Sequence, residues 1–374
     1  MTQEAPPTKA RSVTGDDLYR RSSQYRLWSY TPESLAERKR HTHERGVRKV
    51  NDKFDEAHKR LCEQHPQAFA DHGPQLSRDA LVEYFTLQEE TSYLTYYCMM
   101  ILRLSDSLKM PSQVKATAVS FFRKFYLENS VMEFHPRNVL FTCVFLAAKS
   151  ENCFMKLEAF VNAARKSNSK LTEKDISDLE FTVLSSLKFT LLVHHPFRPL
   201  YGFFLDFQQV LIQAANPPVL TVDRLGALYD RAKRWLSDQA LLTDVQFLFT
   251  PPQIALAALY SVDPAMVETY INKKFPTPTE TKVEATPETK AETKAETNGE
   301  TNGETEEAEE PAPPTPQQLL EVVKQCAQLG SAVPEEDKEA IREIDKKGFF
   351  CLHPTRLIEK RLKKLNPTPP PPPQ

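Results

Sequence analysis

The chain has 374 residues, 40% of them hydrophobic, which is enough for two domains with apolar cores. Its formal net charge of −2 excludes a strong overall attraction to nucleic acid or to an anionic membrane. The six cysteines are scattered without a C-x-x-C pair, and neither a signal peptide nor a membrane-spanning segment is visible. We therefore expect an intracellular protein of a reducing compartment.

Residues 1–30 are polar, and we expect a flexible N-terminal tail that is anchored near Trp28. Ser22 and Ser23 follow two arginines, a basic-then-hydroxyl pattern that is typical of phosphorylation sites. Both serines are candidate phosphorylation sites. Such short patterns are also common by chance, so an unmodified polar tail stays an equal alternative.

Residues 31–65 are expected to form one N-terminal helix, with Thr31 as N-cap and Pro32 at the first helical position. Its basic face carries no interleaved aromatic residues, so we interpret that face as solvated rather than nucleic-acid-binding. The other face shows an apolar stripe at helical spacing: Val47, Val50, Phe54, Ala57 and Leu61. Three possible metal ligands could share one helix face: His58, Cys62 and His65. A zinc site would need a fourth ligand, and none is evident nearby, so we expect no metal site there.

Five helices with short connections are expected between residues 76 and 192. They cover about residues 81–108, 111–128, 135–149, 157–164 and 171–187. The third starts with Pro136 and is apolar on nearly every side, so other helices must surround it. It is shorter than the roughly 20 apolar residues that cross a bilayer, and it ends with a single lysine, Lys149.

A Pro-punctuated linker at residues 194–200 precedes further helices. These cover about residues 201–213, 220–242 and 251–260. The patterns Phe134-His-Pro136-x-x-Val139 and Phe249-Thr-Pro251-x-x-Ile254 correspond, which is a faint internal repeat. The sequence therefore predicts an all-α fold of two related helical bundles with extra N- and C-terminal helices.

The C-terminal third changes in character. Residues 276–314 contain no aromatic residue, and glutamates recur every four residues from Glu280 to Glu304, which predicts a disordered acidic insertion, most simply a spacer between helices. Helical patterns return at Pro316. Residues 334–366 are expected to form C-terminal helices, and residues 367–374 an extended proline-rich tail.

The common catalytic motifs are missing. The sequence contains no G-x-x-x-x-G-K-[ST], G-x-G-x-x-G, H-E-x-x-H or G-x-S-x-G pattern. No pair of acids stands in an apolar setting as a general acid and base. We therefore expect no catalytic residue, no metal and no cofactor, and an interaction module rather than an enzyme.

Two sets of helices, a third helix that ends in F-L-A-A-K and a glutamate on the fifth helix resemble the cyclin box. Four longer stretches are similar to the H-type branch of the cyclin family: Ser22-Ser23-Gln24-x-x-x-Trp28 and residues 124–137, 193–203 and 242–256. The resemblance implies tandem five-helix cyclin boxes at residues 76–192 and 193–333, the second interrupted by the insertion at 276–314.

The resemblance also implies a function. Cyclins of this type bind a cyclin-dependent kinase catalytic subunit together with a RING-finger assembly factor. The assembly phosphorylates the activation loops of other cyclin-dependent kinases. Within general transcription factor H it phosphorylates the C-terminal repeats of RNA polymerase II. The implied location is the nucleus, with no direct nucleic-acid contact and no membrane partner.

Site residues follow from the resemblance position by position. Lys149 and Glu180 match the residues that hold the kinase αC helix and the segment before it. The apolar area around them is expected from four residues: Leu146, Leu184, Phe189 and Leu191. Ser150 replaces a larger, usually apolar neighbour, and Glu151-Asn152 stands where the family often has two acids, so a weaker local contact is expected.

The same residues have simpler explanations when the resemblance is set aside. A lysine at a helix C-terminus is favoured by the macrodipole, Glu180 fits a solvated helix face, and the leucines fit a core. A C-type transcriptional cyclin stays an alternative because it shares the serine and tryptophan pattern, although the run at residues 129–136 favours the H type. A DNA-binding cyclin-like module resembling transcription factor B would need a basic groove and a zinc ribbon, and neither is visible.

Overall fold

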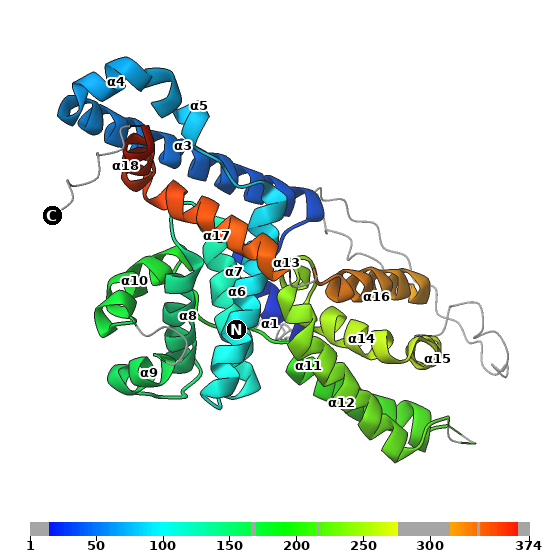
Figure 1. The fold of residues 1–374 in the computed structure, drawn as a ribbon. Coiled ribbons are helices and arrows are strands. Elements are labelled where there is room, and N and C mark those ends of the chain that lie inside the picture. Colours follow the sequence, from blue (N-terminus) through cyan, green and yellow to red (C-terminus); the bar gives the residue numbers. More distant parts are fainter. Residues whose placement is uncertain are drawn as a thin grey trace, which may run out of the picture.

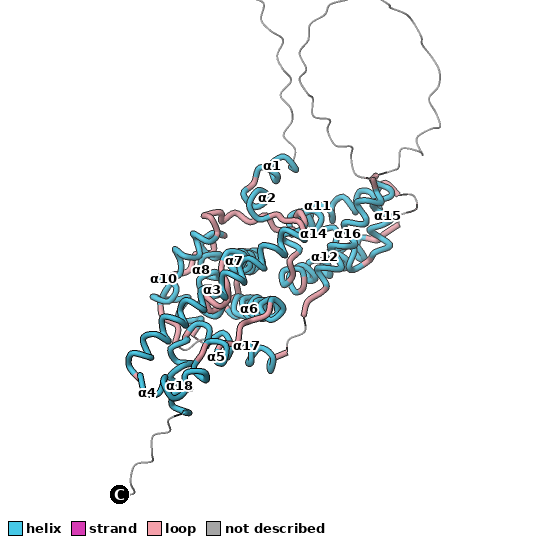
Figure 2. The backbone as a smooth tube through the Cα atoms, turned by 90° about the horizontal axis from the view of Figure 1, so that it is seen from above, coloured by secondary structure: helices cyan, strands magenta, loops and turns pink. Residues whose placement is uncertain are grey.

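The computed structural model describes residues 15–165, 170–215, 217, 219–275, 315–334 and 337–365. Three predicted regions lie outside these residues and stay predictions: the first 14 residues of the tail, the insertion at 276–314 and the tail at 367–374. The described chain consists of helices and loops without a strand, which confirms the all-α class (Figure 2). None of the described helices combines the length and the apolar character that crossing a membrane requires.

The first bundle is built around the expected hub helix. Its helices are α6 (Leu87–Ser107), α7 (Ser112–Glu128), α8 (Pro136–Ser150), α9 (Leu157–Ala164) and α10 (Glu173–Ser186). Every residue of α8 from Val139 to Ala148 is buried, because α6, α7 and α10 all pack against it (Figure 1). The apolar run thus acts as the centre of a helical layer, as expected for a helix without a polar face.

The start of α6 differs from the sequence expectation of one helix over residues 81–108. A short helix, α5 (Arg78–Leu81), ends first, and residues 82–86 are not helical. Thr86 and Glu89 then form a capping box, in which each side chain accepts a hydrogen bond from the backbone N–H of the other residue. This reciprocal cap fixes the start of α6 at Leu87.

The second bundle repeats the arrangement around α14 (Pro251–Val262), which is buried from Ile254 to Leu259. The remaining elements are α11 (Phe197–Phe207), a π-helical turn (Gln208–Gln213), α12 (Val222–Asp238), a 3₁₀ turn (Ala240–Leu242), α13 (Val245–Leu248), α15 (Pro264–Lys274) and α16 (Pro316–Ser331). The indole N–H of Trp235 on α12 donates to Ser331 Oγ at 3.0 Å. A Cβ on Gly330 would lie 2.4 Å from the Trp235 ring, so this glycine permits the close approach of α16 to α12.

Outer helices join the two ends of the chain. The N-terminal helix α3 (Pro32–Gln64) packs against α18 (Pro354–Leu365), with α4 (Pro66–His72) and a short 3₁₀ turn (Gly73–Leu76) at its end (Figure 1). Helix α17 (Lys338–Leu352) leads into α18 and packs against α6. The second part of the expected apolar stripe of α3 packs on α18 through one cluster of buried side chains: Phe54, Ala57, Leu61, Ile358 and Leu362. Val47 and Val50 pack against the core of the first bundle instead. The ring of His58 contacts the rings of Phe54 and Phe69 at centroid distances of 5.9 and 4.9 Å.

Residues 15–28 differ from the expected flexible tail, because they form the short helices α1 (Gly15–Arg21) and α2 (Ser23–Trp28). The Ser22 hydroxyl accepts from Tyr25 N–H at 3.2 Å and thereby caps α2. Trp28 is buried, as the expected anchor requires, and its indole N–H donates to Thr190 Oγ1 at 3.0 Å. The ammonium groups of Lys124 and Lys188 lie 5.5 and 4.7 Å from the Trp28 ring centroid.

Candidate protein-binding surface

The centre of the surface is an ion pair between Lys149 at the end of α8 and Glu180 on α10. The Lys149 ammonium also lies 4.9 Å from the centroid of the Phe145 ring. The two side chains stay 37% and 25% exposed, so a partner can reach both charges. The structure thus brings together the two polar residues that the sequence resemblance singled out, although 31 positions separate them.

Local folding explains these positions. Helix α8 ends at Ser150, and Asn152 then adopts a left-handed backbone with φ 56°. Helix α10 starts at Glu173 because Thr172 and Asp175 form a capping box. Cys153 N–H donates to Ala148 O at 2.9 Å, so the chain folds back over the end of α8 and leaves Lys149 at the surface.

Four large exposed apolar side chains lie on α10 or in the segments that follow α8 and α10, the two helices that carry the ion pair. They are the most exposed of their kind in the first bundle and the loop that follows it: Phe154 (80%), Phe181 (70%), Leu192 (67%) and Phe189 (62%). The Phe181 and Phe189 rings contact edge to face at 6.1 Å. Exposed apolar residues that accompany polar groups often mark protein–protein interaction sites. We call these four residues with Lys149 and Glu180 the α8–α10 surface.

Phe189 lies in a turn with a strained backbone. Lys188 and Phe189 both have φ 53°, in the left-handed region that costs a residue with a Cβ about 1–2 kcal/mol. Phe189 N–H donates to Leu184 O at 3.0 Å, which closes the turn after α10. Strained residues of this kind often mark binding sites, where the position of a side chain matters more than local stability.

The predicted apolar residues divide into two classes. Phe189 is exposed, whereas Leu146 is 3% exposed and belongs to the core around α8. Leu184 and Leu191 are half-buried and pack against the same core. The Ser150 hydroxyl donates to Ala147 O at 3.2 Å and lies at the edge of the surface. Leu146 can therefore shape the surface from below but offers little contact area.

Sequence reasoning missed Phe154, Phe181 and Leu192. Phe181 lies off the apolar stripe of its helix, which comprises Ile176, Leu179, Val183, Leu184 and Leu187. Phe154 follows the hub helix in a segment without helical periodicity. The available signal for Phe181 was a phenylalanine on the predicted polar face of an amphipathic helix.

Acidic and polar neighbours lock the end of α8 to the rest of the fold. Glu151 accepts from Thr117 Oγ1 at 2.6 Å and from Gln113 Nε2 at 2.7 Å. The Thr117 hydroxyl also lies 2.7 Å from His195 Nε2, which links α7 to the segment between the bundles. Burial lowers the pKa of His195 to about 3, with a further contribution from Lys124, so the imidazole is neutral at physiological pH.

The N-terminal helices hold the loop that carries Phe189 and Leu192. The Gln24 side chain accepts from His194 N–H at 2.6 Å and donates to His194 O at 3.2 Å, and Trp28 contacts Thr190. The adjacent Lys124 is buried and its Nζ has no hydrogen-bond partner, and this burial lowers its pKa to about 7. The segment from 190 to 194 is therefore fixed by a part of the chain more than 160 residues away in sequence.

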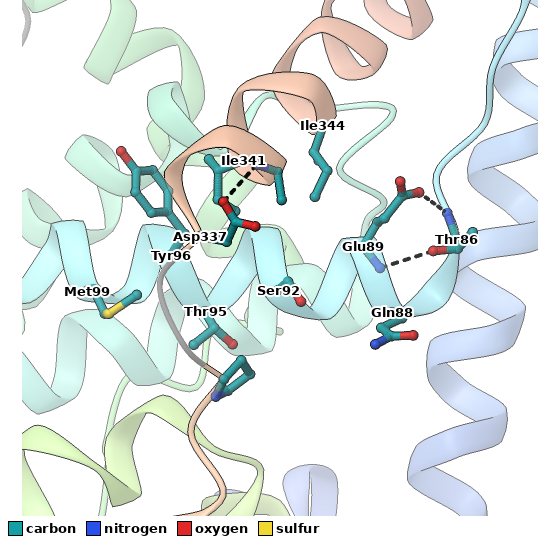
Figure 3. A pocket seen from close by; sticks show the side chains of 12 residues that line it. Thr86, Gln88, Glu89, Ser92, Thr95, Tyr96, Met99, Asp337, Ile341 and Ile344 are labelled. Carbon is teal, nitrogen blue, oxygen red and sulfur yellow. Dashed lines mark hydrogen bonds between the residues drawn. The ribbon is translucent and has the colours of Figure 1, made fainter.

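A cavity of about 280 Å³ lies between α6 and α17 and is a second candidate for a functional site (Figure 3). Ile341 and Ile344 point into it from α17, and Tyr96 and Met99 line it from α6. Its polar rim serves the helix ends: Asp337 accepts from the N–H groups of Glu339 and Ala340, and Thr86 and Glu89 cap α6. Since these polar groups already have backbone partners, the α8–α10 surface is the better candidate.

Comparison with known proteins identifies the family. Residues 79–192 match the family model of the cyclin N-terminal domain, and residues 195–331 match that of the cyclin C-terminal domain. Cyclin CCL1 of Saccharomyces cerevisiae is 39% identical over 365 residues, which cover 96% of this chain and 87% of that protein. The chain belongs to the cyclin family. Cyclin-H of Xenopus laevis is 37% identical over 188 residues, 48% of this chain and 55% of that one, so the resemblance to H-type cyclins is confirmed.

Solved structures agree with this assignment. A chain of the CAK complex from Chaetomium thermophilum bound to ATP-γ-S superposes with a TM-score of 0.67 at 26% identity, covering 95% of this chain and 97% of that one. A chain of the yeast TFIIK (Kin28/Ccl1/Tfb3) complex superposes with a TM-score of 0.57 at 32% identity, covering 83% and 100%. Both neighbours are chains of multi-protein complexes, and the tandem cyclin-box architecture of this chain is the one they have.

Proposed function

We propose that this cyclin is the regulatory subunit of a protein kinase: it binds and activates a cyclin-dependent kinase catalytic subunit and has no catalytic machinery of its own. The observation that carries the proposal is the Lys149–Glu180 pair, accompanied by exposed apolar side chains on α10 and in the segments that follow α8 and α10. The similarity to chains of the CAK and TFIIK complexes supports it.

Activation follows from selective binding. A protein kinase is active when the glutamate of its αC helix is turned in to pair with the β3 lysine. A rigid surface that binds only the turned-in helix shifts the kinase toward that state by its difference in affinity for the two states. Lys149 and Glu180 supply the polar contacts to the αC helix and the segment before it. Phe154, Phe181 and Phe189 supply the apolar area, with Leu192 at the edge.

The predicted neighbours have supporting roles in this proposal. Leu146 holds the floor of the surface, Leu184 and Leu191 hold its sides, and Ser150 leaves space at the edge. Glu151 is already bonded within the chain, so it makes no direct contact with the kinase.

The proposal extends to the assembly. The kinase and this cyclin join a RING-finger assembly factor, and the complex works in the nucleus, within general transcription factor H. It phosphorylates the C-terminal repeats of RNA polymerase II and the activation loops of other cyclin-dependent kinases. The alternative is a C-type cyclin, whose kinase is expected to modify only the repeats. Assaying the purified kinase complex on both substrates separates the two.

The direct test removes the ion pair. Lys149→Ala with Glu180→Ala should weaken kinase binding at least tenfold, measured by calorimetric titration of purified subunits, and should leave the circular dichroism melt near that of the parent. The matched control is the exposed pair Lys324–Glu268 of the second bundle, at 3.7 Å, changed to alanine in the same way. Equal affinity in the two double variants would remove the basis of the proposal.

Ser22 and Ser23 remain proposed phosphorylation sites. The Ser22 hydroxyl donates to Tyr19 O at 2.6 Å and caps α2, so a phosphate there removes a donor and sets a charged group against a carbonyl. We expect the modified form to loosen α2 and with it the loop that carries Phe189. Mass spectrometry of the chain purified from its own cells, with limited proteolysis of the two forms, tests both steps.

A further inference from the structure

Lys124 on α7 is a buried lysine whose Nζ has no hydrogen-bond partner in the described part of the chain. The residue is 2% exposed. Its neighbour Arg123 is buried as well, but the Arg123 guanidinium forms an ion pair with Asp244 at 2.6 Å. A buried cation without such a carboxylate is unfavourable, so this environment favours the uncharged amine of Lys124.

Trp28 covers this lysine. Its ring centroid lies 5.5 Å from Lys124 Nζ, and the tryptophan itself is 1% exposed. Trp28 is the last residue of α2, which lies with α1 at the edge of the molecule (Figure 2). A hydrogen bond from Trp28 to Thr190 and two between Gln24 and His194 hold α2 on the segment that follows α10. Release of α2 would therefore expose Lys124 to water.

The acidic residue of α7 is already paired with other cations. Glu128 follows Lys124 by one helical turn, and its carboxylate pairs with Arg38 and, at 3.0 Å, with Lys188. Lys188 is also the cation nearer to the Trp28 ring, at 4.7 Å from its centroid, so the two ammonium groups compete for that ring. Helix α7 thus leaves Lys124 without a carboxylate of its own.

Further titratable groups come from the segment after α10 and from α2. Burial lowers the pKa of His194 and of His195, and the charge of Lys124 lowers both further. Helix α2 adds one charged side chain, Arg26, and no carboxylate. Burial lowers the pKa of Lys124 itself from its ordinary 10.5 to about 7. Lys124 therefore binds a proton more tightly when its cover is removed.

We propose that α1 and α2, residues 15–28, form a latch that is closed while Lys124 is uncharged and opens when Lys124 takes up a proton. Because the open state binds the proton more tightly, a fall in pH favours opening. With a pKa of about 7 in the closed state and 10.5 in the open state, the ratio of open to closed should rise about fifteenfold from pH 8.5 to pH 7. It should change little below pH 6.

Opening of the latch also frees the segment of residues 190–194, which α2 holds. This segment follows Phe189 and contains Leu192, two exposed apolar residues of the α8–α10 surface. As a consequence that rests on the proposed function, the open latch should weaken kinase binding, since part of the surface is no longer fixed.

Hydrogen exchange of the full chain alone measures the open state even when it is rare. The reporter is the backbone N–H of His194, because its hydrogen bond to Gln24 Oε1, at 2.6 Å, must break when the latch opens. After correction for the intrinsic exchange rate, its protection should fall about fifteenfold from pH 8.5 to pH 7. Lys124→Met removes the titrating group at similar length and should abolish this dependence.

The matched control is Lys188→Met, which removes the other cation at the Trp28 ring and should keep the pH dependence of the parent. The imidazole of His194 does not interfere, since its pKa lies below the usual 6.5 and therefore below this pH range.

Two outcomes would overturn the latch: constant protection of His194 in the parent between the two pH values, or a change in protection that Lys124→Met retains. Calorimetric titration of both chains with the kinase catalytic subunit then tests the consequence. The parent should lose affinity at pH 7 relative to Lys124→Met, and equal affinities at both pH values would overturn the link to kinase binding. Absence of kinase binding in both chains would contradict the proposed function alone, because the exchange measurement needs no kinase.

Discussion

The two hub helices α8 and α14 share a pattern and differ in how they end. Both begin with proline after a Phe-x motif, and both are buried through their centres. Helix α8 ends with Lys149 at the surface beside Glu180. Helix α14 ends at Val262, and Asp263 then accepts from Met266 N–H at 3.2 Å and so caps α15. The polar residue after the second hub helix thus caps the next helix of the same bundle. The polar residue at the end of the first hub helix stays available to a partner.

The largest expected effect tests whether the two hub helices contribute equally to the stability of their bundles. Leu146 on α8 and Leu256 on α14 are both 3% exposed. Replacing either with alanine leaves a cavity and should lower the free energy of unfolding by about 2–5 kcal/mol, measured by urea titration. If Leu146→Ala kept full stability and lost only kinase binding, Leu146 would be a contact residue and the equivalence would fail.

The next effect concerns two exposed phenylalanines of the first bundle. Phe154→Ser with Phe181→Ser should reduce affinity for the kinase at least tenfold, about 1.4 kcal/mol, because apolar contact area is lost. The free energy of unfolding should change by less than about 0.5 kcal/mol per substitution, since both rings face solvent. Val219→Ser with Val222→Ser in the second bundle is the control, and it should leave kinase affinity unchanged.

A smaller effect separates strain from contact. Phe189 and Lys109 have nearly the same left-handed backbone, with φ 53° and 52°. Glycine at either position should relieve about 1 kcal/mol of strain. Lys109→Gly should therefore raise the melting temperature without affecting kinase binding, whereas Phe189→Gly should also weaken binding. Equal kinase affinity in both variants would show that Phe189 is not part of the interface.

The smallest effect belongs to an ion pair of the second bundle. Burial alone would raise the pKa of Asp206, but hydrogen bonds from Lys274, at 2.8 Å, and Tyr270 lower it overall. A carboxyl with a lowered pKa stabilises the fold above its ordinary pKa and loses this contribution as the pH falls through the folded-state pKa. Asp206→Asn should cost less than about 1 kcal/mol at pH 7. Its melting curve should converge with the parent's near pH 3, and a constant difference would contradict the ionic origin.

The hub helices could be predicted from the sequence because a long apolar run leaves a helix no solvated face. The cap of α10 follows from Thr172 and Asp175, which are three residues apart, and short-range patterns of this kind are readable without a fold. The Lys149–Glu180 pair is different, since it joins residues 31 positions apart and was found through family resemblance. Exposure of Phe154 and burial of Leu146 depend on which helices pack together, and no local spacing encodes that.

The positions of the two tryptophans have a practical consequence for spectroscopy. The chain contains only these two. Trp28 joins the N-terminal helices to the first bundle, and Trp235 packs within the second bundle against Gly330. Replacing one of them with phenylalanine leaves a single intrinsic fluorophore in a known place. The emission of one variant then reports release of the N-terminal helices, and that of the other reports melting of the second bundle, without any attached dye.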